Sequence, residues 1–124
     1  MNGNDYLADT NVLIYLLSGN KTIEQFLQGK NVFVSFITEI EILSKKNMKP
    51  AERKIIRQLL DDCVIIDLNS QIKEETILLK QESSLKIPDA IIAATAKYFG
   101  LPLLTNDDAF SKLPDASIAV IQIG

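Results

Sequence analysis

The chain has 124 residues, of which 47% are hydrophobic and 23% charged, so it can form one domain over residues 1–124 but not two. The absence of histidine excludes an imidazole base, and a single cysteine excludes an internal disulfide and a thiolate zinc site. The net charge of −3 is unusual for a nucleic-acid-binding domain, which usually has an excess of basic residues.

Apolar segments typical of strands alternate with segments typical of helices. In chain order we expect a strand at 6–8, helices at 12–17 and 22–27, a strand at 32–35, helices at 37–46 and 50–60, a strand at 64–68, helices at about 70–83 and at 89–99, and strands at 102–104 and 118–123. Strands separated by helices predict an α/β fold, a three-layer sandwich with a mostly parallel five-stranded sheet flanked by helices.

Four acidic residues follow apolar segments that should lie in the core: Asp9, Glu41, Asp89 and Asp107. Two of them come directly after expected strands, and the other two lie on helices, so all four can meet at the carboxyl edge of the sheet. Carboxylates at the edge of a core are unfavourable unless a positive charge holds them. In a chain without histidine, a hard cation is the simplest partner, which predicts metal-dependent chemistry on phosphate.

Two of these acids also have an ordinary structural explanation. Asp9 could serve only as the N-cap of a helix that starts at Thr10, because Asp is a preferred capping residue. Asp89 could serve only as the partner of a helix dipole, because it lies in a first turn. Both explanations stay open at the level of the sequence.

The other two acids each have an acidic neighbour that could take their place. Glu39 and Glu41 lie on opposite flanks of the same apolar helix face, so helical periodicity does not choose between them. Asp107 and Asp108 both follow the expected strand at 102–104, where turn chemistry alone explains an acid.

These stretches resemble the motifs of the PIN-domain ribonucleases, and in particular of VapC-type toxins, over nearly the whole chain. Residues 7–14 resemble the opening strand of the family with its first acid, and residues 89–96 resemble the third motif. The spaced residues of the second motif are matched by Ser35, Thr38 and Glu41. The last motif is matched by Thr105, Asn106, Asp107 and Phe110. The resemblance therefore favours Glu41 over Glu39, and Asp107 over Asp108.

The resemblance implies a PIN-like fold and an endoribonuclease that hydrolyses RNA phosphodiester bonds with Mg²⁺ or Mn²⁺. The implied metal ligands are Asp9 and Asp107 directly, Asp89 directly or through water, and Glu41 through water. The residues expected to support these ligands are Thr10, Asn11, Thr38 and Thr105. The resemblance also implies the role of a toxin, an antitoxin protein that blocks the site, and a homodimer.

A path for RNA requires positive charge, and the densest basic stretch begins after the expected third helix. Lys45, Lys46 and Lys49 are the candidate RNA contacts, although a solvated helical face is the simpler explanation of such a stretch. The first residues lack the layout of a signal peptide, and the longest apolar run, 12–17, is too short to span a bilayer. We therefore expect a cytoplasmic protein with no membrane association.

Two other functions are compatible with an acid after the first strand. The first is an aspartyl phosphotransfer domain, either a phosphatase or a receiver. The phosphatases usually need a second acid two residues after the nucleophile, where this chain has Asn11, and the receivers need a Lys after the last strand, where nothing after Ile118 is basic. The second is a PIN-like module that binds a partner without catalysis.

Overall fold

The structure, a computed structural model, describes residues 3–123. Its helices and strands are, in chain order, β1 Asp5–Ala8, α1 Thr10–Leu17, α2 Lys21–Leu27, β2 Asn31–Ser35, α3 Phe36–Leu43, α4 Pro50–Asp61, β3 Val64–Ile66, α5 Ser70–Glu82, α6 Ile87–Phe99, β4 Leu103–Thr105, the short 3₁₀ helix η1 Asp108–Phe110, and β5 Val120–Gln122. Within this range, no helix is long and apolar enough to cross a membrane.

The five strands form one sheet in the order β3-β2-β1-β4-β5, and every pair of neighbours is parallel. The first three strands run outward from β1 in one direction, and β4 then returns to the other side of β1. The direction of winding therefore changes between β1 and β4, which is where parallel sheets form their binding sites, at the carboxyl ends of the strands. The predicted α/β fold is confirmed.

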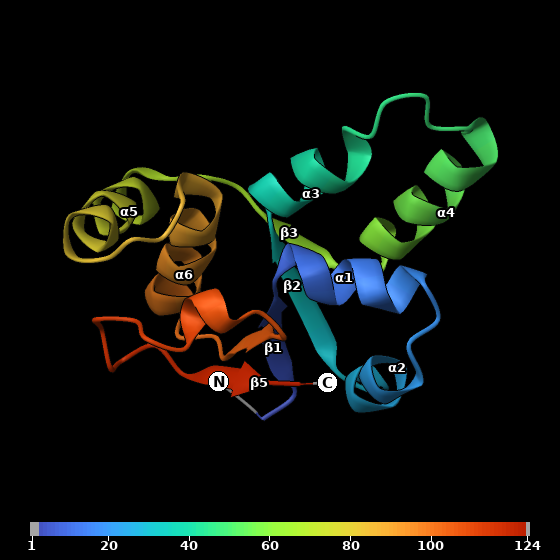
Figure 1. Ribbon diagram of the computed structural model, residues 1–124. Helices are drawn as coiled ribbons and strands as arrows, with labels where there is room; N and C mark the ends of the chain where they lie inside the picture. The colour runs from blue at the N-terminus through green and yellow to red at the C-terminus, as the bar shows by residue number, and fades with distance from the viewer. Residues whose placement is uncertain (1–2, 124) are drawn as a thin grey trace.

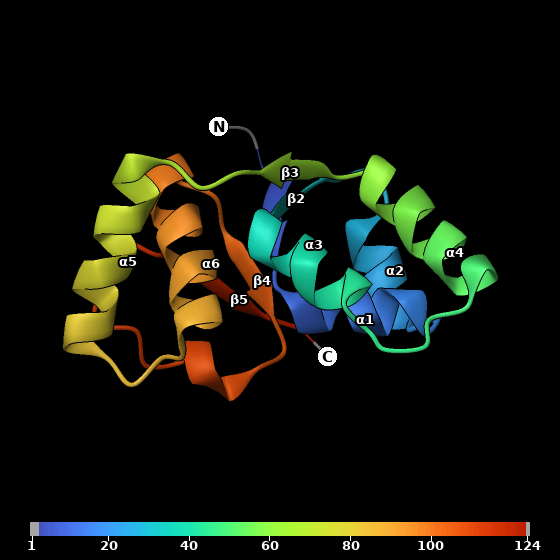
Figure 2. The same cartoon turned by 90° about the horizontal axis from the view of Figure 1, so that it is seen from above.

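Helices cover both faces of the sheet, which gives three layers (Figures 1 and 2). α5 and α6 lie together on one face, and α1, α2 and α4 lie on the other. Each face of the sheet has its own hydrophobic core, and successive residues of a strand point to opposite faces. Leu7 thus packs with α5 and α6, whereas Ala8 packs with α1 and α2. Leu103 and Leu104 alternate in the same way, so β1 and β4 are buried on both faces.

Three elements are shorter than the sequence predicts, namely those expected at 37–46, 64–68 and 118–123. α3 ends at Leu43, and the connection to α4 passes through Asn47, whose φ of 59° is left-handed and does not continue a helix. β3 ends at Ile66, and Asp67 and Leu68 are exposed, so the last two residues of the expected strand are not part of the sheet.

Candidate active site

A cavity of about 340 Å³ opens at the carboxyl ends of β1 and β4. Its lining residues are Asp9, Thr10, Asn11, Ile14, Glu41, Lys86, Pro88, Asp89 and Asp107. The structure thus brings together the four acids singled out in the sequence, from four separate segments of the chain. Asn11 and Thr10, predicted as supporting residues, also face this cavity.

Asp9 lies directly after β1 and is only 3% exposed. One carboxylate oxygen accepts a hydrogen bond from the Val12 N–H at 2.9 Å, so Asp9 does cap α1. The other oxygen accepts a hydrogen bond from the hydroxyl of Thr105 at the end of β4. Burial raises the pKa of Asp9, the two hydrogen bonds oppose this, and the charge of Asp107 adds to the increase.

Thr105 connects the first acid to the last. Its side-chain oxygen accepts a hydrogen bond from the Asp107 N–H at 2.9 Å while its hydroxyl donates to Asp9. Asp107 in turn accepts a hydrogen bond from the Ala109 N–H at 2.9 Å, which starts η1. Asp108 is exposed and lines a different pocket, so the geometry separates the two adjacent acids.

A second set of hydroxyl groups holds Glu41 in the cavity. The Thr10 hydroxyl donates to the Glu41 carboxylate at 2.7 Å. The side-chain oxygens of Thr10 and Thr38 are 3.0 Å apart, and since the Thr10 proton is already used, Thr38 is the donor. Glu39 points to the other flank of α3, where it pairs with Arg57 of α4 at 2.9 Å. Only Glu41 lines the cavity.

Asp89 lies in the first turn of α6 and is partly buried. Within residues 3–123 its side chain accepts no hydrogen bond and forms no ion pair, unlike that of Asp9. Burial raises its pKa, as do, in decreasing order, the charges of Asp107, Glu41 and Asp9. The acids are therefore close enough to repel one another.

Among residues 3–123, Lys86 is the one charged residue of this cavity that was not predicted from the sequence. It is the N-cap residue of α6, three positions before Asp89, and its charge partly offsets the increase in the pKa of Asp89. Within residues 3–123, Lys86 forms no ion pair within 4.0 Å. The signal available in the sequence was its spacing, because residues three apart at a helix start lie on the same side.

The donor set fits a hard divalent cation. Carboxylate oxygens are the ligands that Mg²⁺ and Mn²⁺ prefer, and Mg²⁺ usually retains several waters rather than a complete protein cage. Among residues 3–123, no group of three or more acidic side chains is arranged to hold an ion as it stands, so binding of a cation would require these side chains to move closer together. A cation would also remove the repulsion that raises the pKa of Asp9 and Asp89.

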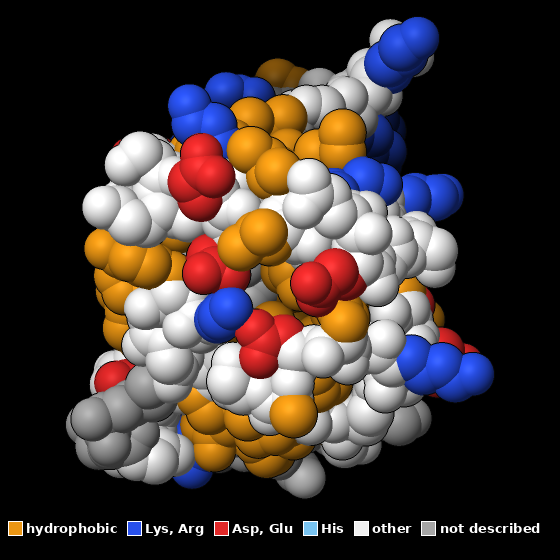
Figure 3. Space-filling model, turned by 90° about the vertical axis from the view of Figure 1, so that its left-hand side faces the viewer, with side chains coloured by type: hydrophobic (Ala, Val, Ile, Leu, Met, Phe, Trp, Pro, Cys, Tyr) orange, Lys and Arg blue, Asp and Glu red, His pale blue; other side chains and the backbone are white. Residues whose placement is uncertain are grey.

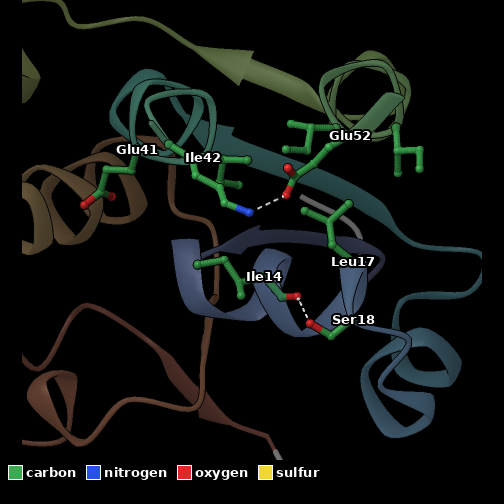
Figure 4. A pocket seen from close by; sticks show the side chains of 9 residues that line it. Ile14, Leu17, Ser18, Glu41, Ile42 and Glu52 are labelled. Carbon is green, nitrogen blue, oxygen red and sulfur yellow. Dashed lines mark hydrogen bonds and ion pairs between the residues drawn. The ribbon is translucent and has the colours of Figure 1, made fainter. Parts of the chain in front are cut away.

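An apolar groove of about 600 Å³ adjoins the cavity and lies between α1, α3 and α4 (Figure 4). Its lining residues are Ile14, Leu17, Ser18, Glu41, Ile42, Lys45, Glu52, Ile55 and Ile56. Ile14 and Glu41 line both the groove and the cavity, so the two are continuous. The sequence did not reveal this groove, because it forms only where three helices meet.

None of the three basic residues proposed as RNA contacts lines the acidic cavity. Lys45 lines the groove and pairs with Glu52 at 2.8 Å, whereas Lys46 and Lys49 are exposed in the connection from α3 to α4. On the face of the molecule seen in Figure 3, most of the visible basic side chains lie toward the top, the level of this connection in Figure 1. Their contact with RNA stays a prediction.

Comparison with known proteins identifies the family. The sequence pattern of the PIN domain matches residues 6–116. A toxin–antitoxin complex from Klebsiella pneumoniae contains a chain with 34% identity and a TM-score of 0.81, and the match covers 94% of this chain and 96% of that chain.

Two further structures share the fold. VapBC2 from Rickettsia felis, bound to a promoter DNA fragment, has 20% identity, a TM-score of 0.85 and coverage of 97% and 99%. DNA-bound VapBC from Salmonella typhimurium has 19% identity, a TM-score of 0.83 and coverage of 95% and 97%. No curated protein is similar enough to count as a match. The resemblance predicted from the sequence is thus confirmed: the chain shares its fold with chains of toxin–antitoxin complexes, and it belongs to the PIN domain family.

Proposed function

We propose that the protein is a metal-dependent endoribonuclease that hydrolyses RNA phosphodiester bonds, and that it is the toxin of a toxin–antitoxin pair. The observation that carries this proposal is the convergence of Asp9, Glu41, Asp89 and Asp107 on one cavity. The raised pKa of Asp9 and of Asp89 supports it, because such carboxylates favour a bound cation. We propose a cytoplasmic location, where an RNA substrate is present.

Asp9 and Asp107 would hold Mg²⁺ or Mn²⁺ directly, Asp89 directly or through water, and Glu41 through water. When bound, the ion would acidify a water and stabilise negative charge on the phosphodiester oxygens, which removes the need for a histidine base. Thr105 keeps Asp9 oriented while Asp9 also caps α1. Thr10 holds Glu41 in place through a hydrogen bond.

Lys86 gives the cavity a positive side chain that belongs to the chain itself. Because it forms no ion pair within residues 3–123, its ammonium group is available to the phosphate of a substrate. We assign to it the attraction of RNA toward an otherwise acidic cavity. Lys45, Lys46 and Lys49 would extend this attraction along the α3–α4 connection.

Cleavage of total RNA tests the proposed activity. The wild-type protein and Asp9→Asn, purified identically, are assayed with Mn²⁺, with Mg²⁺ and with EDTA. Asn keeps an oxygen for the Val12 N–H, so the variant is expected to fold, while the loss of charge should remove cleavage. Equal cleavage by both proteins, or cleavage that persists in EDTA, would contradict the assignment.

We further propose that the apolar groove receives a segment of the antitoxin. The relatives named above were solved as toxin–antitoxin or VapBC complexes, and the groove leads directly to the acids through Ile14 and Glu41. Ile14 is 46% exposed and Ile55 is 58% exposed, so both present apolar surface that a partner would cover. A segment bound there would also reach the cavity and block it. The homodimer stays a prediction.

The groove proposal predicts that Ile55→Glu weakens antitoxin binding by roughly 10- to 100-fold, because burial of one such side chain contributes about 1.5–3 kcal/mol. The product of the neighbouring gene is tested as the antitoxin, and its affinity for each protein is measured by titration calorimetry. Leu68→Glu is the matched control, since Leu68 is 44% exposed and lies outside the groove. Equal affinities of the two variants would contradict the proposal.

A further inference from the structure

A second polar cavity, of about 490 Å³, lies beside the carboxylate cavity. Its lining residues are Tyr15, Asn20, Ile23, Asn106, Gln122 and Ile123. None of these side chains carries a formal charge at neutral pH, which distinguishes the pocket from the acidic cavity next to it. A phosphate or a metal ion therefore has no ionic partner here, whereas a neutral ligand with polar edges does.

Two elements place this pocket next to the acids. On α1, Tyr15 follows Asn11 by one helical turn, and Asn11 lines the carboxylate cavity. After β4, Asn106 directly precedes Asp107. The Gln122 amide also donates a hydrogen bond to the backbone carbonyl of Asp107 at 3.3 Å. A ligand that extends beyond the acids in this direction enters the neutral pocket.

Tyr15 supplies an aromatic surface to the pocket. It is 46% exposed, and within residues 3–123 its ring stacks on no other aromatic ring, in contrast to Tyr6, which contacts Phe26, and to Tyr98, which contacts Phe99. The fold therefore does not use this ring as a partner in an aromatic pair. An exposed aromatic ring beside a proposed phosphate site is the arrangement on which single-stranded nucleic acid bases stack.

Three amide side chains around the ring retain unused hydrogen-bonding groups. Asn20 uses its oxygen to cap α2 at Ile23, which leaves its NH₂ group available. Gln122 uses its NH₂ group on Asp107, which leaves its oxygen available. The Asn106 side chain makes no hydrogen bond within residues 3–123. Donors and acceptors together can pair with the polar edge of a heterocycle.

We propose that this pocket binds a nucleobase of the RNA strand, adjacent to the phosphodiester that lies at the carboxylates. The inference rests on the proposed ribonuclease function and extends it to a subsite for substrate recognition. The phosphate remains at the cavity that holds Lys86 and the acids, while the base turns into the neutral pocket, stacks on Tyr15 and pairs with Asn106 and Gln122. The pocket thereby contributes to the choice of cleavage site.

The first arm of the test measures cleavage of a single-stranded RNA that the wild-type protein cuts. Tyr15→Ala is expected to raise KM by roughly 10- to 100-fold, the effect of losing one base–aromatic stack. Its kcat should change little, because Tyr15 does not line the carboxylate cavity. Tyr15→Phe should retain the wild-type KM. Tyr98→Ala is the control, because Tyr98 has a similar exposure, 45%, but lies on α6 outside this pocket.

The second arm needs neither metal nor cleavage. The four neutral ribonucleosides are titrated into ¹⁵N-labelled protein in EDTA, and the side-chain amide signals of Asn106 and Gln122 are followed. Shifts of these signals in the wild type that are lost in Tyr15→Ala support the pocket even if no RNA is cleaved, in which case only the ribonuclease function fails. No nucleoside-dependent shift, or an unchanged KM in Tyr15→Ala, overturns the nucleobase assignment and leaves the ribonuclease function standing.

Discussion

Replacement of Asp107 by Asn is expected to lower the rate of metal-dependent RNA cleavage by at least about 100-fold, because a bound metal contributes several kcal/mol of charge stabilisation and each 1.4 kcal/mol changes a rate about tenfold. Asn retains an oxygen that can accept the Ala109 N–H, so η1 should persist. The variant therefore removes the charge while it keeps the local structure. Initial rates on one RNA substrate, at saturating Mn²⁺, provide the measurement.

Asp108→Asn is the matched control, since it makes the same chemical change one residue further along. Asp108 is exposed and does not line the carboxylate cavity, so its variant should cleave RNA at nearly the wild-type rate. The reverse order, with Asp108→Asn inactive and Asp107→Asn active, would show that the ligand in the last motif had been assigned to the wrong acid.

The sequence was sufficient to predict the layers of the fold, for a physical reason. β1 and β4 are buried on both faces, and such strands consist of short, wholly apolar runs such as Leu7-Ala8 and Leu103-Leu104 that are easy to recognise. Once such a strand is recognised, the direction of the chain shows which of its ends is the carboxyl end. An acid placed directly after such a strand, as Asp9 is, must lie at the same edge of the sheet.

The acid on α3 could not be chosen in the same way. Periodicity places Glu39 and Glu41 on opposite flanks of one apolar face, and which flank meets the sheet edge depends on where neighbouring helices lie. In the structure, Arg57 of α4 forms an ion pair with Glu39 on one flank of α3. On the other flank, the Thr10 hydroxyl of α1 donates a hydrogen bond to Glu41. These are contacts between distant segments, which no local pattern contains. Only the motif resemblance favoured Glu41 beforehand.

Surfaces assembled from several elements were beyond prediction for the same reason. Lys86 was overlooked because it lies at a helix start among loop residues, where its spacing from Asp89 is a weak signal until the cavity is known. The groove beside Ile55 and the pocket beside Tyr15 each combine residues from separate elements. Apolar side chains such as these resemble ordinary core residues in the sequence, and their exposure becomes evident only in three dimensions.

Substitution of Asp89 by Asn is expected to raise the melting temperature of the metal-free protein by a few degrees at pH 7. Asp89 is partly buried, has no hydrogen-bond partner within residues 3–123, and is repelled by three other acids. Asn removes this repulsion and loses no contact, although it gives up an attraction to the helix dipole of about 0.3–1 kcal/mol. In excess Mg²⁺ the order should reverse, because the wild type gains stability from the ion and the variant gains less.

The pH dependence follows from the direction of the pKa shifts. The pKa of Asp9 and that of Asp89 are raised on folding, so the folded protein binds protons more tightly than the unfolded chain at pH values above the ordinary Asp pKa of about 4. Above the pKa values of the folded state both carboxyl groups are charged, and their destabilisation of the fold is complete. The free energy of unfolding in EDTA should therefore rise as the pH falls from 7 toward 5, because protons begin to neutralise these charges. Asp115 acts in the opposite direction, because Lys97 holds its pKa at about 2, but its contribution is lost only below pH of about 4.

Thermal unfolding of the wild type, Asp89→Asn and the control Asp108→Asn at pH 5, 6 and 7, in EDTA and in Mg²⁺, separates these effects. In EDTA, the melting temperatures of the wild type and of the control should rise as the pH falls. The melting temperature of Asp89→Asn should rise less. Mg²⁺ should abolish this pH dependence, because the ion replaces protons as the neutralising charge. A lower melting temperature of Asp89→Asn in EDTA at pH 7 would contradict the prediction. It would mean that the attraction of Asp89 to the dipole of α6 outweighs its burial and its repulsion by the other acids.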